Sequence, residues 1–156
     1  MTTKITPMLW FDTQAEDAAK FYTSIFPNSK IGPVTRYGDN MPMPKGTAMT
    51  VTFTLDGQEY TALNGGPHFQ FSEAISLVIH CRDQKEIDHY WGKLLAGGSA
   101  QQCGWLKDRY GLSWQVVPTA LMSILAEGGP AAARAMQAVM QMVKLDLAAI
   151  ETAAHG

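Results

Sequence analysis

The feature that most constrains the fold is an internal repeat without gaps. The stretch from Ile5 to Phe26 recurs at an offset of 70 residues, which matches Ile5 to Ile75, Thr6 to Ser76, Gln14 to Gln84 and Phe21 to Trp91. In both copies, a short apolar run predicts a strand (5–11 and 75–81) that leads into a Gln-x-Glu helix. Asp12 or Thr13 is expected to cap the first helix, which ends at Pro27-Asn28. A duplicated strand–helix unit predicts two similar modules, whose equivalent strands are expected to converge on one cleft.

The segments that follow each helix complete the modules. Alternating apolar and polar residues over 47–55, followed by Asp56-Gly57, predict a hairpin in the first module, after a strand at 30–37. Three short strands are expected in the second module, at 99–103, 105–108 and 112–117. The chain is therefore predicted to be an α+β protein made of two βαβββ modules. We expect one domain over 1–156, with module one at 4–66, module two at 73–118 and a C-terminal helical extension at 119–156.

The chain changes character after Pro118. A short helix is expected at 119–126, and one long helix is expected at 130–153 after a break rich in glycine. An apolar seam runs along the long helix, formed by Met136, Met140, Val143, Leu147 and Ile150. The seam is expected to pack on the chain's own sheet, on a second copy in a homodimer, or on a partner protein, and the sequence leaves these alternatives open.

Composition excludes several classes of protein. Hydrophobic residues make up 46% of the 156 residues and charged residues 17%, which is typical of a globular protein. A net charge of −2 without a basic stripe argues against nucleic-acid binding. No apolar run reaches about 18 residues, so no membrane span is expected. The N-terminal residues 1–4 lack an apolar signal core, which predicts a cytoplasmic protein. Cys81 and Cys103 lie in no metal-binding or redox spacing and are expected to be thiols, with roles left open.

Two sequence blocks carry a resemblance to a known family. They are Ala62-Leu63-Asn64-Gly65-Gly66-Pro67 with Phe69-Gln70-Phe71, and Gln102 to Asp108 continuing through Tyr110 to Pro118. The chain resembles the 3-demethylubiquinone-9 3-methyltransferase-like (PhnB-like) family of the glyoxalase/bleomycin-resistance/dioxygenase (vicinal oxygen chelate) superfamily. The resemblance covers nearly the whole chain, the Met-rich C-terminal helix included. It implies curled mixed sheets around a cleft that dimerisation usually completes, and it leaves the reaction open because one fold supports many chemistries.

The same resemblance allows the metal site of the superfamily to be tested position by position. Metal-dependent members carry His or Glu on the first and last strands of each module. Here the first-strand positions are Thr6 and Ser76, and the last-strand positions are Gln115 and, by the same count, Thr61. Hydroxyls and amides are weak ligands for a transition metal, so no metal and no other cofactor are expected.

Strand alternation predicts which side chains line the cleft. The set comprises Thr6, Met8, Trp10, Thr61, Ser76, Val78, His80, Ser113 and Gln115. Such a surface suits a small, mostly apolar ligand with one or two oxygens to orient. Three of these residues also have a structural explanation: Trp10 as plain core, His80 as a core histidine bonded to a carbonyl, and Gln115 as a partner of a neighbouring strand.

Three classes of function remain. The first is a metal-free binding protein for a small molecule. The second is an enzyme: a metal-dependent isomerase, lyase or dioxygenase, the methyltransferase that the family name implies, or a metal-free acid–base catalyst using His80. No glycine-rich strand–loop–helix segment for a methyl donor is found. The third is an interaction protein that docks a partner on the Met-rich helix.

Overall fold

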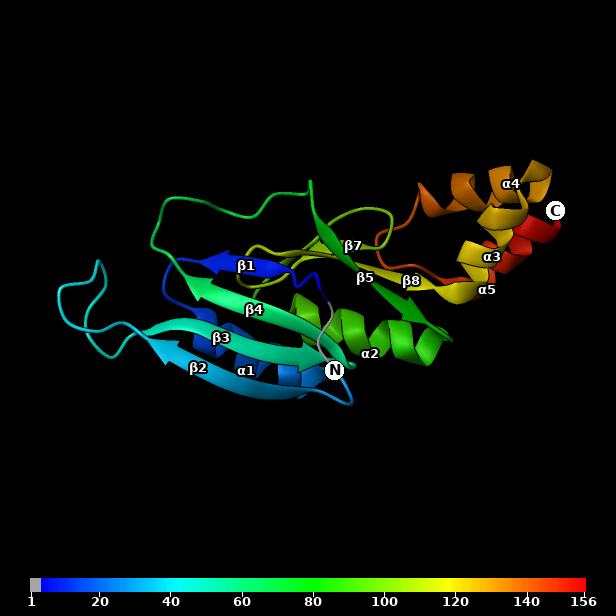
Figure 1. The fold of residues 1–156 in the computed structure, drawn as a ribbon. Helices are drawn as coiled ribbons and strands as arrows, with labels where there is room; N and C mark the ends of the chain where they lie inside the picture. Colours follow the sequence, from blue (N-terminus) through cyan, green and yellow to red (C-terminus); the bar gives the residue numbers. More distant parts are fainter. Residues whose placement is uncertain (1–3) are drawn as a thin grey trace. The chain divides into compact units, whose positions relative to one another are not determined.

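The computed structural model describes residues 4–156 and divides the chain into two units, Met1–Phe71 and Ser72–Gly156. Each unit has its own four-stranded sheet with a helix packed on it (Figure 1). None of the helices in residues 4–156 is long and apolar enough to cross a membrane.

The two units share one topology, which confirms the α+β fold of two βαβββ modules. The first contains β1 (Met8–Phe11), α1 (Ala15–Ile25), β2 (Lys30–Arg36), β3 (Ala48–Leu55) and β4 (Gln58–Asn64). The second contains β5 (Ser76–Cys81), α2 (Gln84–Leu95), β6 (Ser99–Ala100), β7 (Trp105–Lys107) and β8 (Ser113–Pro118). The strand orders are β1-β4-β3-β2 and β5-β8-β7-β6, and in each sheet the first and last strands of the module pair in parallel. Both sheets are therefore mixed and related by the sequence repeat.

Side-chain alternation gives each sheet one buried and one more open face. In the first unit Val51 and Phe53 on β3 are buried, and the Phe53 ring lies 6.2 Å from that of Tyr22 on α1. The alternate positions of β3 carry threonines that are only partly buried. The helix thus covers the apolar face, and the threonine-rich face is left for other contacts.

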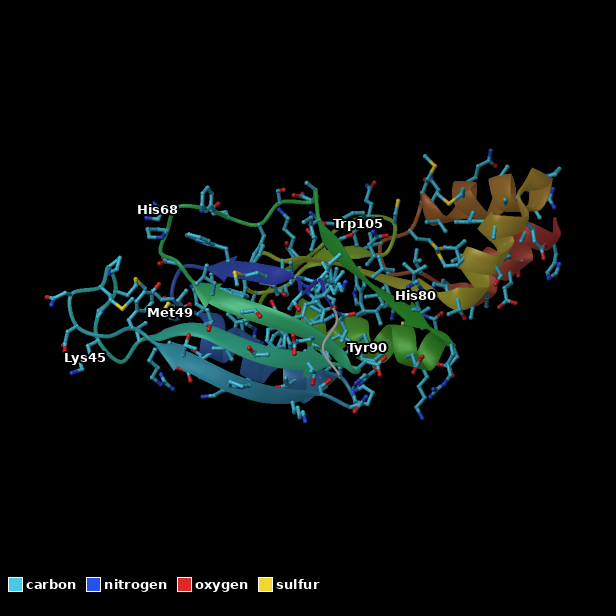
Figure 2. All side chains as sticks on the ribbon, viewed as in Figure 1. Lys45, Met49, His68, His80, Tyr90 and Trp105 are labelled. Atoms are coloured by element: carbon cyan, nitrogen blue, oxygen red, sulfur yellow. The ribbon has the colours of Figure 1, made fainter. Side chains whose placement is uncertain are left out.

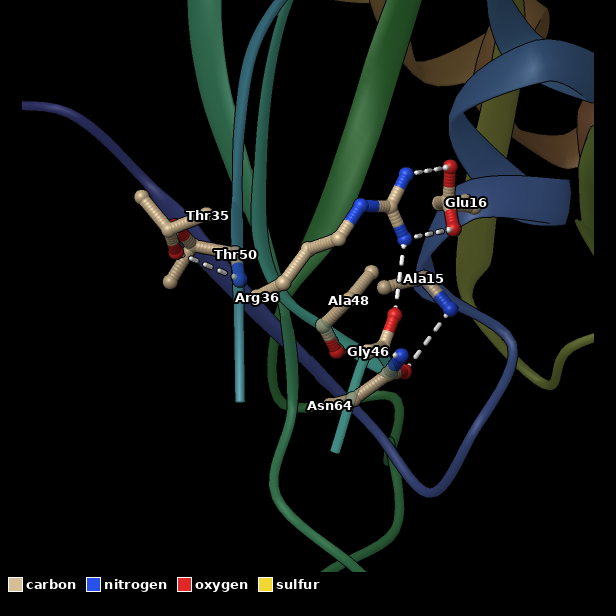
Figure 3. A network of polar contacts seen from close by, with 8 residues as sticks. All are labelled: Ala15, Glu16, Thr35, Arg36, Gly46, Ala48, Thr50 and Asn64. Carbon is tan, nitrogen blue, oxygen red and sulfur yellow. Dashed lines mark hydrogen bonds and ion pairs between the residues drawn. The ribbon is translucent and has the colours of Figure 1, made fainter. Parts of the chain in front are cut away.

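The start of α1 is held by a side chain from the far end of its module. The N-cap residue is Gln14, whose side chain makes no capping bond, so the prediction that Asp12 or Thr13 caps this helix was wrong. Instead Oδ1 of buried Asn64 accepts from the N–H of Ala15 at 2.9 Å, and its Nδ2 donates to the carbonyl of Ala48 at 3.0 Å (Figure 3). The side-chain amide of Asn64 on β4 therefore provides hydrogen-bond partners for the first N–H of α1 and for the first carbonyl of β3.

A buried carboxylate organises the last hairpin of the second unit. Asp108 accepts from the indole Nε1 of Trp114 at 2.8 Å and from the backbone N–H groups of Tyr110 at 2.8 Å and Leu112 at 3.1 Å. Because these donors span the turn between β7 and β8, Asp108 fixes which residues of the two strands lie opposite each other. This explains physically why Asp108 and Trp114 stand six residues apart in the sequence block from Gln102 to Pro118.

The C-terminal extension forms three helices, α3 (Thr119–Glu127), α4 (Gly129–Val139) and α5 (Leu147–His155), so the single long helix predicted over 130–153 was wrong. The chain leaves the helix after Met140 because the carbonyls of Met142 and Val143 accept hydrogen bonds from the N–H groups of Cys103 and Gly104, both at 2.8 Å. Asp146 then caps α5. The extension has its own core, formed with Val117 by Leu121, Ala135, Val139, Leu145, Ile150 and Ala154.

Candidate functional site

The strand register identifies equivalent positions in the two modules. Met8 pairs with Thr61 across β1 and β4, and Val78, its counterpart in the repeat, pairs with Gln115 across β5 and β8. Thr61 and Gln115 therefore occupy the same place in their modules, as do Thr6 and Ser76 at the start of the first strands.

In the first unit the predicted residues lie on the face opposite α1. The hydroxyl of Thr6 donates to a carboxylate oxygen of Glu59 at 3.2 Å, which ties the first strand to the last. Met8 is 57% exposed, and Thr61 is half-buried beside it. This face thus presents an apolar side chain next to hydroxyl and carboxylate groups.

Trp10 belongs to the same strand but supports the loop that follows β4. Its Nε1 donates to the carbonyl of Gly66 at 3.0 Å, and its ring meets Phe69 edge-on at 4.9 Å. A Cβ atom at Gly65 would overlap the indole ring, so the loop needs glycine there. The indole N–H of Trp10 already has a hydrogen-bond partner within the unit, while its half-buried ring remains able to contact a ligand.

In the second unit the corresponding polar pair is formed by Ser76 and Gln115. The Nε2 of Gln115 donates to the hydroxyl of Ser76 at 3.0 Å, and Val78, directly opposite Gln115, is 40% exposed. His80, two residues further along β5, is exposed, and no hydrogen bond or ion pair joins it to another residue of the part described (Figure 2). The alternative of a core histidine bonded to a carbonyl is therefore wrong, and no neighbouring group orients its imidazole.

Ser113 and its neighbours form a second polar group on this face, one that sequence reasoning identified only in part. Ser113 lies opposite Lys107 in the β7–β8 pair and opposite Ser76 in the β5–β8 pair. The Lys107 ammonium is 3.2 Å from one carboxylate oxygen of Glu73, and Nε2 of Gln101 donates to the other at 3.2 Å. The signal that could have found this group is the turn expected at 109–111 between two predicted strands, which places Lys107 across from Ser113.

Neither unit offers a donor set that fits a divalent transition metal. Within residues 4–156, no three or more His, Cys, Asp or Glu side chains gather in one place. The positions in question hold hydroxyls and an amide. The carboxylate of Glu59 is engaged by Thr6, and that of Glu73 by Lys107 and Gln101. The hydroxyl of Ser76 is likewise engaged, by Gln115. These residues do not fit the metal centre of the metal-dependent members.

The two thiols differ in their surroundings. Cys81 is fully buried, and burial, with smaller effects from Glu86 and Asp83, raises its pKa to about 12. Its thiolate is therefore inaccessible at neutral pH. Cys103 is half-buried and adopts a left-handed backbone conformation (φ 62°) next to Gly104, where its N–H bonds to the extension. Its geometry serves the attachment of the C-terminal helices.

Comparison with solved structures agrees with this fold. The PhnB protein from Bacillus cereus, described as a 3-demethylubiquinone-9 3-methyltransferase, is 38% identical over 74% of this chain and 99% of its own, with a TM-score of 0.69. PA1353 from Pseudomonas aeruginosa is 20% identical over 75% of this chain and 98% of its own (TM-score 0.63), and supports the fold alone. So does the fosfomycin resistance protein FosX from Listeria monocytogenes, solved with Mn(II) and sulfate, at 12% identity over 76% and 90% of the two chains (TM-score 0.52).

No protein with a curated description matches the chain. The sequence profile of one family matches residues 3–117, which stops short of the three C-terminal helices and leaves their expected resemblance to the family without support. The matched region spans both βαβββ modules. This chain therefore belongs to the family described as 3-demethylubiquinone-9 3-methyltransferase, within the glyoxalase fold.

Proposed function

We propose that this chain is a metal-free member of the glyoxalase fold that binds a small, mostly apolar organic ligand on the exposed faces of its sheets. The observation that carries the proposal is the hydrogen bond from Gln115 to Ser76 at 3.0 Å, which joins two positions that the family resemblance equates with metal ligands. A hydroxyl and an amide that satisfy each other have no charge to offer a cation, but they can orient a ligand oxygen.

The exposed apolar side chains support the same proposal. Met8 and Val78 occupy equivalent positions of the repeat and are 57% and 40% exposed, each directly beside a polar residue of the paired strand. An apolar contact with a few hydrogen-bonding groups around it is the usual composition of a small-molecule site. These contacts suit a small, mostly apolar molecule with one or two oxygens.

Guaiacol (2-methoxyphenol) is a suitable probe, followed by amide chemical shifts of the isotopically labelled chain. We expect shifts on β5 and β8, unchanged by EDTA, and weaker binding for Gln115→Leu. The matched control is Gln137→Leu, since Gln137 is an exposed glutamine on α4. Binding that disappears with EDTA, or that both variants weaken equally, would refute the proposal.

Methyl transfer is the alternative that the family description favours. A methyl donor's nucleotide half is normally held where a strand passes into a helix through a glycine-rich loop. Here the connections are Asp12–Gln14 before α1 and Arg82-Asp83 before α2, and neither contains glycine. Incubating the protein with methyl-labelled S-adenosylmethionine and catechol tests this directly, because label in a methyl ether would establish the alternative.

A further inference from the structure

The face of the second sheet that carries Ser113 holds a row of polar side chains across its strands. Register places Lys107, Ser113 and Ser76 side by side on β7, β8 and β5. Gln101 lies at the same edge, because its N–H bonds to the carbonyl of Trp105, whose side chain shares the Lys107 face. With Ser99, which pairs with Lys107 on β6, the row holds an ammonium and three hydroxyls, and Gln101 adds an amide next to it.

One carboxylate already occupies this row. Glu73, in the turn before β5, places one oxygen 3.2 Å from the ammonium of Lys107 and the other 3.2 Å from Nε2 of Gln101. The arrangement is a two-point carboxylate site. The hydrogen bond from Lys107 and one from the backbone of Glu73 itself, with a smaller effect of Gln101, lower the pKa of Glu73. The occupant is held weakly, because the Glu73 side chain is 52% exposed and that of Lys107 is 31% exposed.

Two buried polar atoms of the residues named above have no hydrogen-bond partner within residues 4–156. They are the hydroxyl oxygen of Ser113, on a fully buried residue, and Oε1 of Gln101. Buried polar atoms are almost always paired, so an unpaired donor and an unpaired acceptor in one cluster point to a missing ligand. The Ser113 hydroxyl suits a ligand anion, while Oε1 of Gln101 is an acceptor and needs a ligand hydroxyl.

We propose that Lys107, Ser113 and Gln101 bind the carboxylate and adjacent hydroxyl of a small hydroxy acid, and that Glu73 is an internal competitor which this ligand displaces. The inference rests on the ligand-binding role proposed above for this sheet face and adds to its apolar contacts a separate polar subsite, which takes an anionic group. A hydroxy acid should bind this site more favourably than the Glu73 side chain does. Its carboxylate and hydroxyl pair with the Ser113 hydroxyl and with Oε1 of Gln101, which Glu73 leaves without partners.

The test is a titration of the labelled full chain with sodium glycolate at low ionic strength, followed by amide shifts, with sodium chloride as the ionic control. Glu73→Gln removes the competitor and should tighten glycolate binding about 2- to 6-fold, the range corresponding to an exposed ion pair. Lys107→Met should weaken it about 10-fold or more. The matched control is Lys93→Met, an exposed lysine in the last turn of α2.

Ser113→Ala supplies a readout that a structural role would not produce. Deleting a buried, unpaired hydroxyl should leave the resistance to urea equal or higher, while glycolate binding weakens. Acetate, which lacks the hydroxyl, should bind more weakly than glycolate. Equal affinities of Glu73→Gln and the parent chain, or equal effects of Lys107→Met and Lys93→Met, would overturn the inference. Guaiacol binding without glycolate binding would refute this site alone and leave the broader proposal standing.

Discussion

Replacing Asp108 by asparagine removes the charge that holds the last hairpin while keeping its shape. The carboxylate accepts three hydrogen bonds, and the bond from Trp114 Nε1, at 2.8 Å, uses the oxygen that asparagine would replace with an NH₂ group. A hydrogen bond to a charged group contributes about 1.5–3 kcal/mol, against about 0.5–1.5 for a neutral one. Losing the indole bond and weakening the two backbone bonds should therefore lower the free energy of unfolding by about 3 kcal/mol.

Urea unfolding of the full chain, followed by far-UV circular dichroism, measures this cost. Asp39→Asn is the control, because Asp39 is exposed and has only a surface ion pair with Lys45 at 3.4 Å. Its cost should stay below about 1 kcal/mol. On a Trp114→Phe background, where the indole donor is gone, Asp108→Asn should cost about half as much as in the parent chain. An equal cost on both backgrounds, or a cost no greater than the control's, would refute the reasoning.

Three further predictions follow from buried or exposed side chains. Asn64→Ala leaves the N–H of Ala15 and the carbonyl of Ala48 without their hydrogen bonds, so urea unfolding should show a free energy of unfolding lower by about 2–4 kcal/mol. A decrease of less than about 1 kcal/mol would contradict the capping role of Asn64. Burial raises the pKa of Cys81 to about 12, so Ellman's reagent at about pH 8 should label only Cys103 in the native chain and both thiols in urea. Labelling of a natively folded Cys103→Ser variant would contradict this prediction. Met136 and Met140 are 37% and 58% exposed, so if they form the predicted homodimer contact, Met140→Glu should reduce the sedimenting mass to that of one chain. A parent chain that already sediments as a monomer would end that prediction.

The topology was readable from the sequence because duplication leaves the same spacing in both copies. Strand alternation then fixed which side chains share a face, as the pairing of Met8 with Thr61 and of Val78 with Gln115 shows. Contacts between segments that are distant in the sequence could not be predicted from it. The cap of α1 comes from Asn64, 49 positions away from the N–H it accepts, and no local pattern announces such a bond.

The break between α4 and α5 escaped prediction for a related reason. The apolar spacing from Met136 to Ile150 continues through the break, so periodicity alone favours one helix. The backbone of Met142 and Val143 is instead held by Cys103 and Gly104 on the sheet side, which is a tertiary constraint. The same limit applies to the candidate site. The bond of Thr6 with Glu59 was not predicted, and for Gln115 the sequence offered a polar partner on a neighbouring strand without identifying it as Ser76.

The central claim is that hydroxyl and amide groups stand where related proteins hold a metal ion. Isothermal titration of the metal-stripped chain with manganese(II) chloride tests it most directly. We predict heats no larger than those of dilution and no ion retained after dialysis. Stoichiometric binding with micromolar affinity or better, lost in a Ser76→Ala, Gln115→Ala double variant, would contradict the account.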